Sequence, residues 1–344
     1  MKEIINLLDM NQDQISEYLA SIGQPLYRAK QLYSWLMQGA SLGEMTNLPK
    51  AMREKIAEDG VYYLPQVVAK QTSKDGTTKF LFRLKDGECI ESVVMNYRHG
   101  ITICVSSQGG CRMGCKFCAS TGGGVRFSRN LTSGEMLGQV IVAQREIGQR
   151  IGGIVLMGIG EPLDNYDNVL NFIRVAGGEE GLGISLRSIA ISTCGLADKI
   201  RQLAKEDLPI TLTISLHAPD DDTRQQIMPI NARWGVDEVL AAARDYFTAT
   251  GRRVSFEYML LEGINDNIRQ AKDLGEKLQK YMRDMPYHVN LIPWNNVSGR
   301  FSPSSTEAVG KFYEGLRRMG VNATIRRTLG GDIAAACGQL RQGK

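Results

Sequence analysis

The sequence lacks long apolar stretches, and this absence excludes a helix that crosses a membrane. No segment approaches the roughly 18 consecutive apolar residues that such a helix needs. The opening segment, MKEIINLLDMNQDQ, has too short an apolar run for a secretory signal peptide. We therefore expect a cytoplasmic protein with no membrane partner. Repeats and low-complexity tracts are also absent, so 344 residues that are 43% hydrophobic predict one large globular domain with a smaller addition.

Structural disulfides are not expected either. A reducing cytosol keeps thiols free, so the seven cysteines indicate metal binding or catalysis. Cys89, Cys104, Cys194 and Cys337 are isolated in the sequence, and a lone cysteine is usually a small buried apolar residue. Cys89 and Cys194 are expected to be structural.

The chain has no strong excess of one charge, with 41 Lys and Arg against 37 Asp and Glu. The distribution is more informative than the total. Residues 317–344 contain one acidic side chain, Asp332, and six basic ones, which are Arg317, Arg318, Arg326, Arg327, Arg341 and Lys344. A local basic patch suits a polyanion, although a solvated terminal face has the same composition.

Hydrophobic periodicity divides the chain into four parts. Residues 1–55 show helical spacing and predict an N-terminal helical accessory domain. Residues 56–99 alternate in strand fashion around the turns SKDG and KDGE, which predicts a β-hairpin linker region. Residues 100–300 form the core. Residues 301–344 are expected to provide a C-terminal helix, a strand that includes Arg326 and Arg327, and a mobile segment that carries Cys337.

The core alternates apolar strands with amphipathic helices. Strands are expected at 101–107, 152–158, 187–193, 210–217, 253–260 and 288–294, and helices at 132–148, 166–176, 236–249 and 267–283. Six such units predict an α/β fold with a parallel sheet that is buried on both faces. Functional loops in these folds follow the carboxyl ends of the strands.

A cluster of three cysteines follows the first of these strands. The stretch GGCRMGCKFCASTGGG places Cys111, Cys115 and Cys118 in a C-x3-C-x2-C pattern, and its glycines allow the side chains to converge. Structural zinc needs four closed ligands, and the sequence offers no second cysteine pair. A cubane iron–sulfur cluster held by three thiolates leaves one iron open to another ligand. The spacing therefore favours such a cluster, with zinc and unligated thiols as alternatives.

This pattern resembles the signature of radical S-adenosylmethionine (SAM) enzymes. Within that superfamily the chain resembles the RlmN family, bacterial dual-specificity methyltransferases that modify carbon 2 of adenosine in 23S rRNA and tRNA. The matching segments are SSQGGCRMGCKFCAST, MGIGEPLDN, ISLHAP, MPIN, HVNLIPWN and RRTLGGDIAAACGQL, and the resemblance covers essentially the whole chain. It implies a partial (β/α)6 TIM-like barrel, a [4Fe-4S] cluster on the three cysteines, and two SAM molecules per turnover.

A related family, the Cfr-type resistance methyltransferases, acts on carbon 8 of the same ribosomal adenosine. Its glycine segment tends to read GEAL, whereas residues 160–163 read GEPL here, which favours carbon 2. Two features depart from the RlmN pattern. The stretch GGGVRFSRNL is longer than usual, and Ala334 stands where aspartate is common.

The resemblance also assigns residues that bind SAM. They are Gly160, Glu161, Ser192, Ser215, Leu216, His217 and Asn295. Without the family, Gly160 and Glu161 would be interpreted as a tight turn, because Leu163 replaces the third glycine of a dinucleotide fingerprint. His217 alone would be interpreted as a satisfied histidine at a strand end, and Asn295 as part of a loop.

The family chemistry implies roles for Cys337, Cys104 and Glu91. Carbon 2 of adenine is not nucleophilic, so it requires a carbon radical. The resemblance implies that one SAM methylates Cys337, and that a deoxyadenosyl radical from a second SAM then takes hydrogen from this S-methyl group. The methylene adds to the ring, Glu91 accepts the ring proton, and Cys104 releases the product by forming a disulfide with Cys337. Local alternation alone would place Cys104 in the core and Glu91 on a solvent-facing strand.

The remaining expectations concern partners. We expect a monomer that uses an electron donor such as flavodoxin or ferredoxin. The RNA must present its adenosine out of the stack, against the basic C-terminal strip and the helical N-terminal module. Two alternatives stay open, namely a carbon-8 methyltransferase and a zinc-dependent RNA-binding protein without catalysis.

Overall fold

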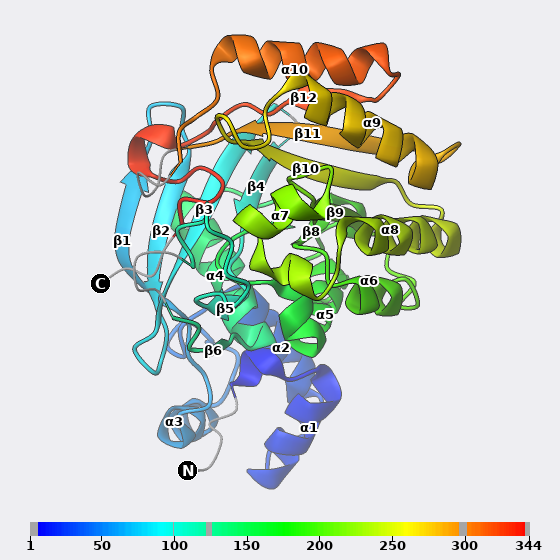
Figure 1. The fold of residues 1–344 in the computed structure, drawn as a ribbon. Helices are drawn as coiled ribbons and strands as arrows, with labels where there is room; N and C mark the ends of the chain where they lie inside the picture. Colours follow the sequence, from blue (N-terminus) through cyan, green and yellow to red (C-terminus); the bar gives the residue numbers. More distant parts are fainter. Residues whose placement is uncertain (1–5, 99, 122–125, 296–300, 341–344) are drawn as a thin grey trace.

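The computed structural model describes residues 6–98, 100–121, 126–295 and 301–340. Its centre is a ten-stranded sheet in the order β1-β2-β3-β4-β7-β8-β9-β10-β11-β12 (Figure 1). The strands are β1 (Gln66–Thr72), β2 (Thr78–Arg83), β3 (Cys89–Tyr97), β4 (Gly100–Cys104), β7 (Gly153–Leu156), β8 (Ile189–Thr193), β9 (Thr211–Ser215), β10 (Val254–Leu260), β11 (Tyr287–Pro293) and β12 (Ala323–Ile325). A separate pair consists of β5 (Gln108–Gly109) and β6 (Arg129–Asn130).

Strands β4 to β12 of the large sheet run parallel, whereas β1 to β4 are joined antiparallel. Within the described residues β1 and β12 each pair on one side, so the sheet stays open and forms a partial barrel. The first three strands therefore continue the sheet of the core. The expected α/β fold with a partial (β/α)6 barrel is confirmed.

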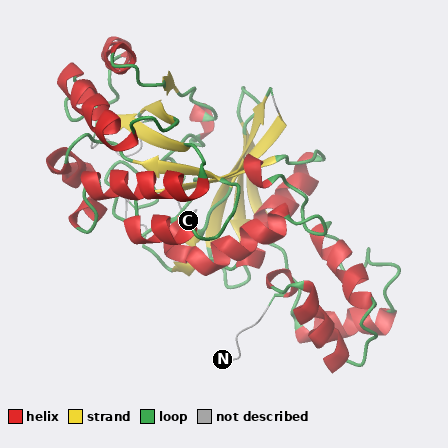
Figure 2. Ribbon diagram, turned by 90° about the vertical axis from the view of Figure 1, so that its right-hand side faces the viewer, coloured by secondary structure: helices red, strands yellow, loops and turns green. Residues whose placement is uncertain are grey.

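Helices follow the parallel strands in chain order and lie outside the sheet (Figure 2). The α-helices are α1 (Gln12–Ser21), α2 (Arg28–Met37), α3 (Lys50–Asp59), α4 (Ser133–Ile147), α5 (Tyr166–Gly177), α6 (Ala197–Leu203), α7 (Asp221–Ile227), α8 (Val236–Thr250), α9 (Ile268–Met282) and α10 (Thr306–Arg318). Short 3-10 turns are η1 (Leu7–Asp9), η2 (Pro162–Asn165), η3 (Leu186–Ser188), η4 (Pro229–Ala232) and η5 (Gly331–Ile333).

Local sequence explains where several helices begin. Helices α1, α4 and α9 start at capping boxes, in which a side chain before the helix and a Gln or Glu three residues later satisfy the free backbone amides. Helix α9 buries one stripe, which includes Leu274 and Leu278, and this stripe gives the periodic signal that predicts it. None of the helices in the described parts of the chain has the length and apolar character needed to cross a bilayer.

The N-terminal helices lie at the bottom of Figure 1, and the η1 turn that precedes them packs against α4. The amide of Leu7 donates to the carbonyl of Val61 at 2.7 Å, and Arg145 of α4 contacts Glu44 at 2.9 Å.

Two details differ from the expected boundaries. Strand β1 begins after Pro65, which lacks an amide for the ladder, and β12 ends at Ile325, just before Arg326 and Arg327. The seven-residue helices α6 and α7 were not predicted, because so few residues give little periodicity.

Candidate active site

Two cavities lie where the parallel strands end. The larger, about 790 Å³ and partly open to solvent, is lined by most of the predicted residues. These are Cys111, Cys115, Cys118, Gly160, Glu161, Ser192, Ser215, His217 and Cys337. The second cavity, about 580 Å³, is lined by Cys104, Asn295 and again Cys337. Leu216 and Glu91 are buried outside the walls of both cavities.

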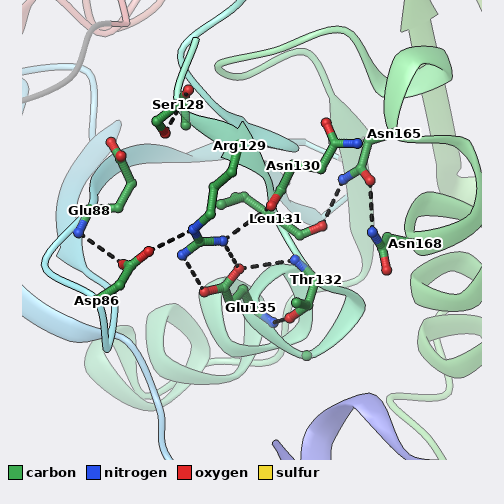
Figure 3. A network of polar contacts seen from close by, with 12 residues as sticks. Asp86, Glu88, Ser128, Arg129, Asn130, Leu131, Thr132, Glu135, Asn165 and Asn168 are labelled. Atoms are coloured by element: carbon green, nitrogen blue, oxygen red, sulfur yellow. Dashed lines mark hydrogen bonds and ion pairs between the residues drawn. The ribbon is translucent and has the colours of Figure 1, made fainter. Parts of the chain in front are cut away.

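The cysteine loop is closed at its base by the β5–β6 pair, in which Gly109 faces Arg129. Figure 3 shows how Arg129 anchors this base between two carboxylates. Its guanidinium donates to Asp86 in the β2–β3 turn at 2.6 Å and to Glu135 of α4 at 2.7 and 2.8 Å. Gly110 has φ +77°, and a Cβ there would lie 2.3 Å from the carbonyl oxygen of Arg126. The loop therefore requires glycine at this position.

Asp164 ties the cysteine loop to the loop that follows β7. The guanidinium of Arg112 donates to both carboxylate oxygens of Asp164, at 2.6 and 2.8 Å. Gln108 reaches the same carboxylate at 2.8 Å. The GEPL segment, which precedes Asp164, is thus fixed against the cysteines.

The three clustered thiols form a donor set that fits a metal centre. Burial raises the pKa of Cys111 to about 12 and also raises the pKa of Cys115 and Cys118, so that each thiol is protonated unless a cation compensates. A bound metal ion deprotonates a coordinating thiol. In the described parts of the chain no three Cys, His, Asp or Glu side chains converge on one point as ligands of a single ion. Three thiols suit a cubane cluster by their number and chemistry, because each thiolate would bind a different iron atom.

Gly160 and Glu161 lie where β7 and β8 end. Gly160 has φ +110°, and a Cβ there would lie 2.7 Å from Gln108. The carboxylate of Glu161 is buried and accepts hydrogen bonds from the amides of Leu163 at 3.0 Å and Cys194 at 2.7 Å. Burial nevertheless raises the pKa of Glu161, and these two hydrogen bonds oppose that shift. Glu161 therefore holds two loops together while it lines the cavity.

His217 is a neutral ring in the cavity wall. Its Nδ1 accepts a hydrogen bond from the amide of Met259 at 2.9 Å, which leaves the proton on Nε2. Burial, with the charge of Arg224 as a second cause, lowers the pKa of His217 to about 3. Its backbone has φ +59°, and its ring meets Phe117 edge to face. His217 is thus hydrogen-bonded at a strand end, as its local sequence predicts, and it also lines the cavity that contains the other residues assigned to SAM by the resemblance.

Arg224 of α7 is a buried residue beside the site that sequence reasoning missed. Its side chain is fully buried and points to five oxygen acceptors. These are the carbonyls of Cys194 (2.6 Å), Leu216 (3.0 Å), Trp234 (3.1 Å) and Ser215 (3.4 Å) and the side chain of Asn231 (3.1 Å). Arg224 therefore fixes the ends of β8 and β9, including the backbone of the predicted residues Ser215 and Leu216. The nearby MPIN segment was the only signal for it.

Glu257 of β10 was also missed. It is 3% exposed and lines the larger cavity. Its Oε1 accepts from Asn290 at 3.0 Å and lies 3.6 Å from Arg326, whereas its Oε2 has no hydrogen-bond partner among the described residues. A buried carboxylate oxygen without a donor is costly, so the cavity suits a ligand that supplies one.

Arg326 does not belong to an exposed basic strip, contrary to the expectation from charge. It lines both cavities, pairs with Glu257 and points its guanidinium at the sulfur of Met157, 3.7 Å away. Arg317, Arg318 and Arg327 are exposed as expected. The other two basic residues of the strip, Arg341 and Lys344, lie outside the described residues, as do the glycines at 122–124.

Cys337 and Cys104 face the same cavity, and neither forms a disulfide. Cys104 ends β4 in a small apolar cluster with Val93 and Ala335. Burial and the neighbouring Cys337 raise the pKa of Cys104 to about 12. Glu91 of β3 is 7% exposed, not solvent-facing, and its carboxylate lies 3.3 Å from the ammonium of Lys79.

Comparisons with known proteins identify the family of this arrangement. The model of the radical SAM superfamily matches residues 105–274, and the model of the ribosomal RNA large subunit methyltransferase N-terminal domain matches residues 5–61. A probable dual-specificity RNA methyltransferase RlmN from Clostridium tetani is 49% identical, over 99% of this chain and 97% of the relative. Its counterpart from Clostridium acetobutylicum is 48% identical, over 98% and 97%. The chain belongs to the RlmN family.

A solved structure supports the same fold for this RlmN-family chain. A radical SAM methyltransferase from Sphaerobacter thermophilus superposes with a TM-score of 0.92 at 42% identity, and the match covers 98% of this chain and 99% of that one. The protein is therefore a radical SAM RNA methyltransferase, and its family implies SAM and a [4Fe-4S] cluster as cofactors. The expected family, enzyme class and cofactor types are confirmed.

Proposed function

We propose that this RlmN-family enzyme methylates carbon 2 of adenosine in 23S rRNA and tRNA, with Cys337 as the carrier of the methyl group. The observation that supports it most is the place of Cys337, which lines both cavities. One cavity contains the three clustered cysteines and the other contains Cys104. A thiol at this junction can receive a methyl group on one side and meet a second thiol on the other.

We propose that Cys111, Cys115 and Cys118 hold the cluster, and that SAM occupies the space between them and residues Gly160, Glu161, Ser192, Ser215 and His217. The close approach of backbone at Gly160 and the Nε2 proton of His217 suit a polar nucleoside. Asn295, which lines the second cavity, and Leu216, which is buried outside both cavities, belong to the proposed set through the family resemblance alone. When bound, the cluster and SAM supply a methyl group and a carbon-centred radical.

Cys337, Glu91 and Cys104 then carry out the remaining steps, which are proton transfer and disulfide formation. The methylene radical that forms on the sulfur of Cys337 adds to carbon 2 of the base, and the adduct gives up one electron, for which the cluster would be the acceptor. Glu91 accepts the ring proton, and Lys79, 3.3 Å from its carboxylate, stabilises the charge that Glu91 carries beforehand. The sulfur of Cys104 attacks the sulfur of Cys337 and forms the disulfide as the carbon–sulfur bond breaks. The proton that the Cys104 thiol loses balances the one that the departing carbon takes to become the methyl product.

The two cysteines should fail in different ways when each is replaced. Cys337→Ala lacks the sulfur that carries the methyl group and should bind no RNA covalently. Cys104→Ala should still form the thioether and should accumulate a crosslink to RNA, seen as a band on a denaturing gel that ribonuclease collapses. Cys89→Ala, which removes a half-buried cysteine outside both cavities, is the matched control and should keep full activity. Normal turnover by Cys104→Ala without a crosslink would contradict this division of labour.

Cluster content and product position can be measured directly. Anaerobically reconstituted protein should contain about four iron and four sulfide, and Cys115→Ala should lose SAM cleavage. Zinc in stoichiometric amount without iron would contradict the cluster.

Nucleoside mass spectrometry of treated 23S rRNA and tRNA should yield 2-methyladenosine. A product that is chiefly 8-methyladenosine would instead assign the chain to the resistance-type reaction.

Two further parts of the proposal concern partners. We propose that flavodoxin or ferredoxin delivers the electron, and that the enzyme acts as a monomer. Reduced flavodoxin or ferredoxin should support SAM cleavage by the holoenzyme, and sedimentation should give a mass close to 38.0 kDa. A dimer at micromolar concentration would reject the proposed monomer. No cleavage with either donor would reject the proposed electron donors.

A further inference from the structure

The segment that carries Cys337 is attached to the protein on both sides of this residue. On the far side, the amide of Ala119 donates to the carbonyl of Gly338 at 2.8 Å, and Ser120 donates to the carbonyl of Leu340 at 2.7 Å. These bonds come from the cysteine loop. On the near side the contacts come from a different part of the chain, namely the β1–β2 hairpin, which lies beside the red segment in Figure 1.

The turn between β1 and β2 supplies most of these near-side contacts. The carboxylate of Asp75 accepts a hydrogen bond from the amide of Gly330 at 2.9 Å. Asp332 accepts two in return, from the hydroxyl of Ser73 at 2.5 Å and from the amide of Lys74 at 3.3 Å. On β2, Lys79 donates to the carbonyl of Ala334 at 3.3 Å. We call these contacts of Ser73, Lys74, Asp75 and Lys79 with residues 330–334 the clasp.

The backbone of the clasped segment has the conformations that such docking needs. Gly330 has φ +64°, and a Cβ there would lie 2.8 Å from Ala335 and 3.0 Å from Thr77 of the hairpin. Glycine is therefore required for the segment to approach the turn. Ala334 also adopts a left-handed conformation, with φ +50°, which is uncommon for alanine. A conformation of this kind persists where surrounding contacts hold it.

We propose that the clasp is the positioning element for Cys337, fixing the near side of its segment so that the thiol stands between the two cavities. The role of Cys337 as methyl carrier rests on the proposed function, but the clasp itself does not. Lys79 links the two, because its ammonium contacts Glu91 as well as the carbonyl of Ala334. One side chain therefore contacts both the segment of the carrier and the proposed proton acceptor.

Hydrogen exchange on the reconstituted full-length holoenzyme tests the clasp. The double variant Ser73→Ala/Asp75→Ala removes two side-chain partners of the segment. Exchange in peptides spanning 329–336 should become about tenfold faster or more, whereas peptides of β8 and β9 should keep their rates. Lys74→Ala is the matched control: it lies in the same turn but contributes only its backbone amide, so its exchange should equal that of the wild type.

Two other variants keep the test decisive. Asp75→Asn keeps one acceptor oxygen for the two amides, of Thr77 and Gly330, that now bind the two carboxylate oxygens, so its exchange should lie between that of the wild type and that of the double variant. Asp332→Ala opens the clasp from the opposite side and should accelerate the same peptides if the double variant does not fold. In each clasp variant the rate of RNA methylation should fall while SAM affinity, measured by equilibrium dialysis, stays within twofold.

Unchanged exchange at 329–336 in folded double and Asp332→Ala variants would overturn the proposal. Slowed methylation caused by weaker SAM binding would also overturn it, since the clasp would then act on the cofactor site. If exchange accelerates as expected but Cys337 never carries a methyl group in the active wild-type enzyme, the clasp stands and the proposed function falls.

Discussion

Replacing Arg224 should destabilise the protein more than replacing any surface arginine. Its fully buried guanidinium satisfies acceptors on the residues that follow β8 and β9, in η4, and just before α8. Arg224→Met fills similar space but leaves these oxygens without donors. Each unsatisfied buried acceptor costs roughly 1–3 kcal/mol, and partial relaxation lets some of them find other partners. We therefore expect the free energy of unfolding to fall by about 4 kcal/mol, a large share of the roughly 5–15 kcal/mol that folded proteins have.

Urea denaturation followed by circular dichroism measures this loss. Arg201→Met is the matched control, because Arg201 is partly exposed and pairs with Asp245 at 2.8 Å on the surface of α6 and α8. Such pairs contribute about 1 kcal/mol or less, so the control should change little. Arg224→Lys should fall between the two, since an ammonium has three donors and cannot span the same acceptors. A loss below about 1 kcal/mol for Arg224→Met would refute the view that these hydrogen bonds hold the strand ends.

Two further predictions concern single residues near the site. Burial lowers the pKa of His217 to about 3 in the folded chain, whereas the same side chain binds a proton near pH 6.5 in the unfolded chain. The free energy of unfolding should therefore fall by about 1.4 kcal/mol for each pH unit below 6.5 because of this residue. His217→Asn, which tolerates the positive φ, should reduce that slope between pH 6 and 5 in denaturation curves, and an unchanged slope would count against it. Ala334→Asn should raise the unfolding free energy by roughly 1 kcal/mol, because asparagine accepts the left-handed conformation more readily. A lower melting temperature in calorimetry would contradict this reasoning.

Sequence patterns predicted the features that depend on neighbours along the chain. The alternation of apolar segments gave the parallel strands, and three closely spaced cysteines marked the loop that forms one wall of the larger cavity. Gly160 and His217 follow strand ends, so their convergence could be expected once the strands were known to be parallel. Family resemblance added Cys104 and Cys337, which no local pattern would bring together.

The residues that sequence reasoning missed or misplaced are charged side chains whose partners lie far away in the chain. Arg224, Glu257 and Arg326 look like ordinary surface residues in a sequence, since charged side chains are seldom fully buried without partners. Their burial depends on acceptors and donors from other elements, such as the pair between Glu257 and Arg326. Only the packed sheet places these partners together. The clasp between residues 73–79 and 330–334 escaped prediction for the same reason.

Arg326 lines the cavities, whereas the other described arginines of the basic C-terminal strip are exposed. Replacing the two kinds of arginine separately therefore tests RNA binding and chemistry apart from each other. Arg317 and Arg318 are exposed at the end of α10, where phosphates can reach them. Replacing both by Gln should weaken RNA binding and reduce the slope of log affinity against log salt by roughly 0.7–0.9 for each phosphate that the protein no longer neutralises.

Arg326→Gln should behave differently, because this guanidinium faces Glu257 and the cavities rather than solvent. Its removal leaves Glu257 with only Asn290 as a described donor, so SAM affinity and the methylation rate should fall while the salt slope of RNA binding stays at the wild-type value. Filter binding at several salt concentrations and equilibrium dialysis with SAM measure the two effects on the same preparations. If Arg326→Gln lowers the salt slope as much as the Arg317→Gln/Arg318→Gln pair does, then Arg326 contacts RNA phosphate and its assignment to the cavity wall is wrong.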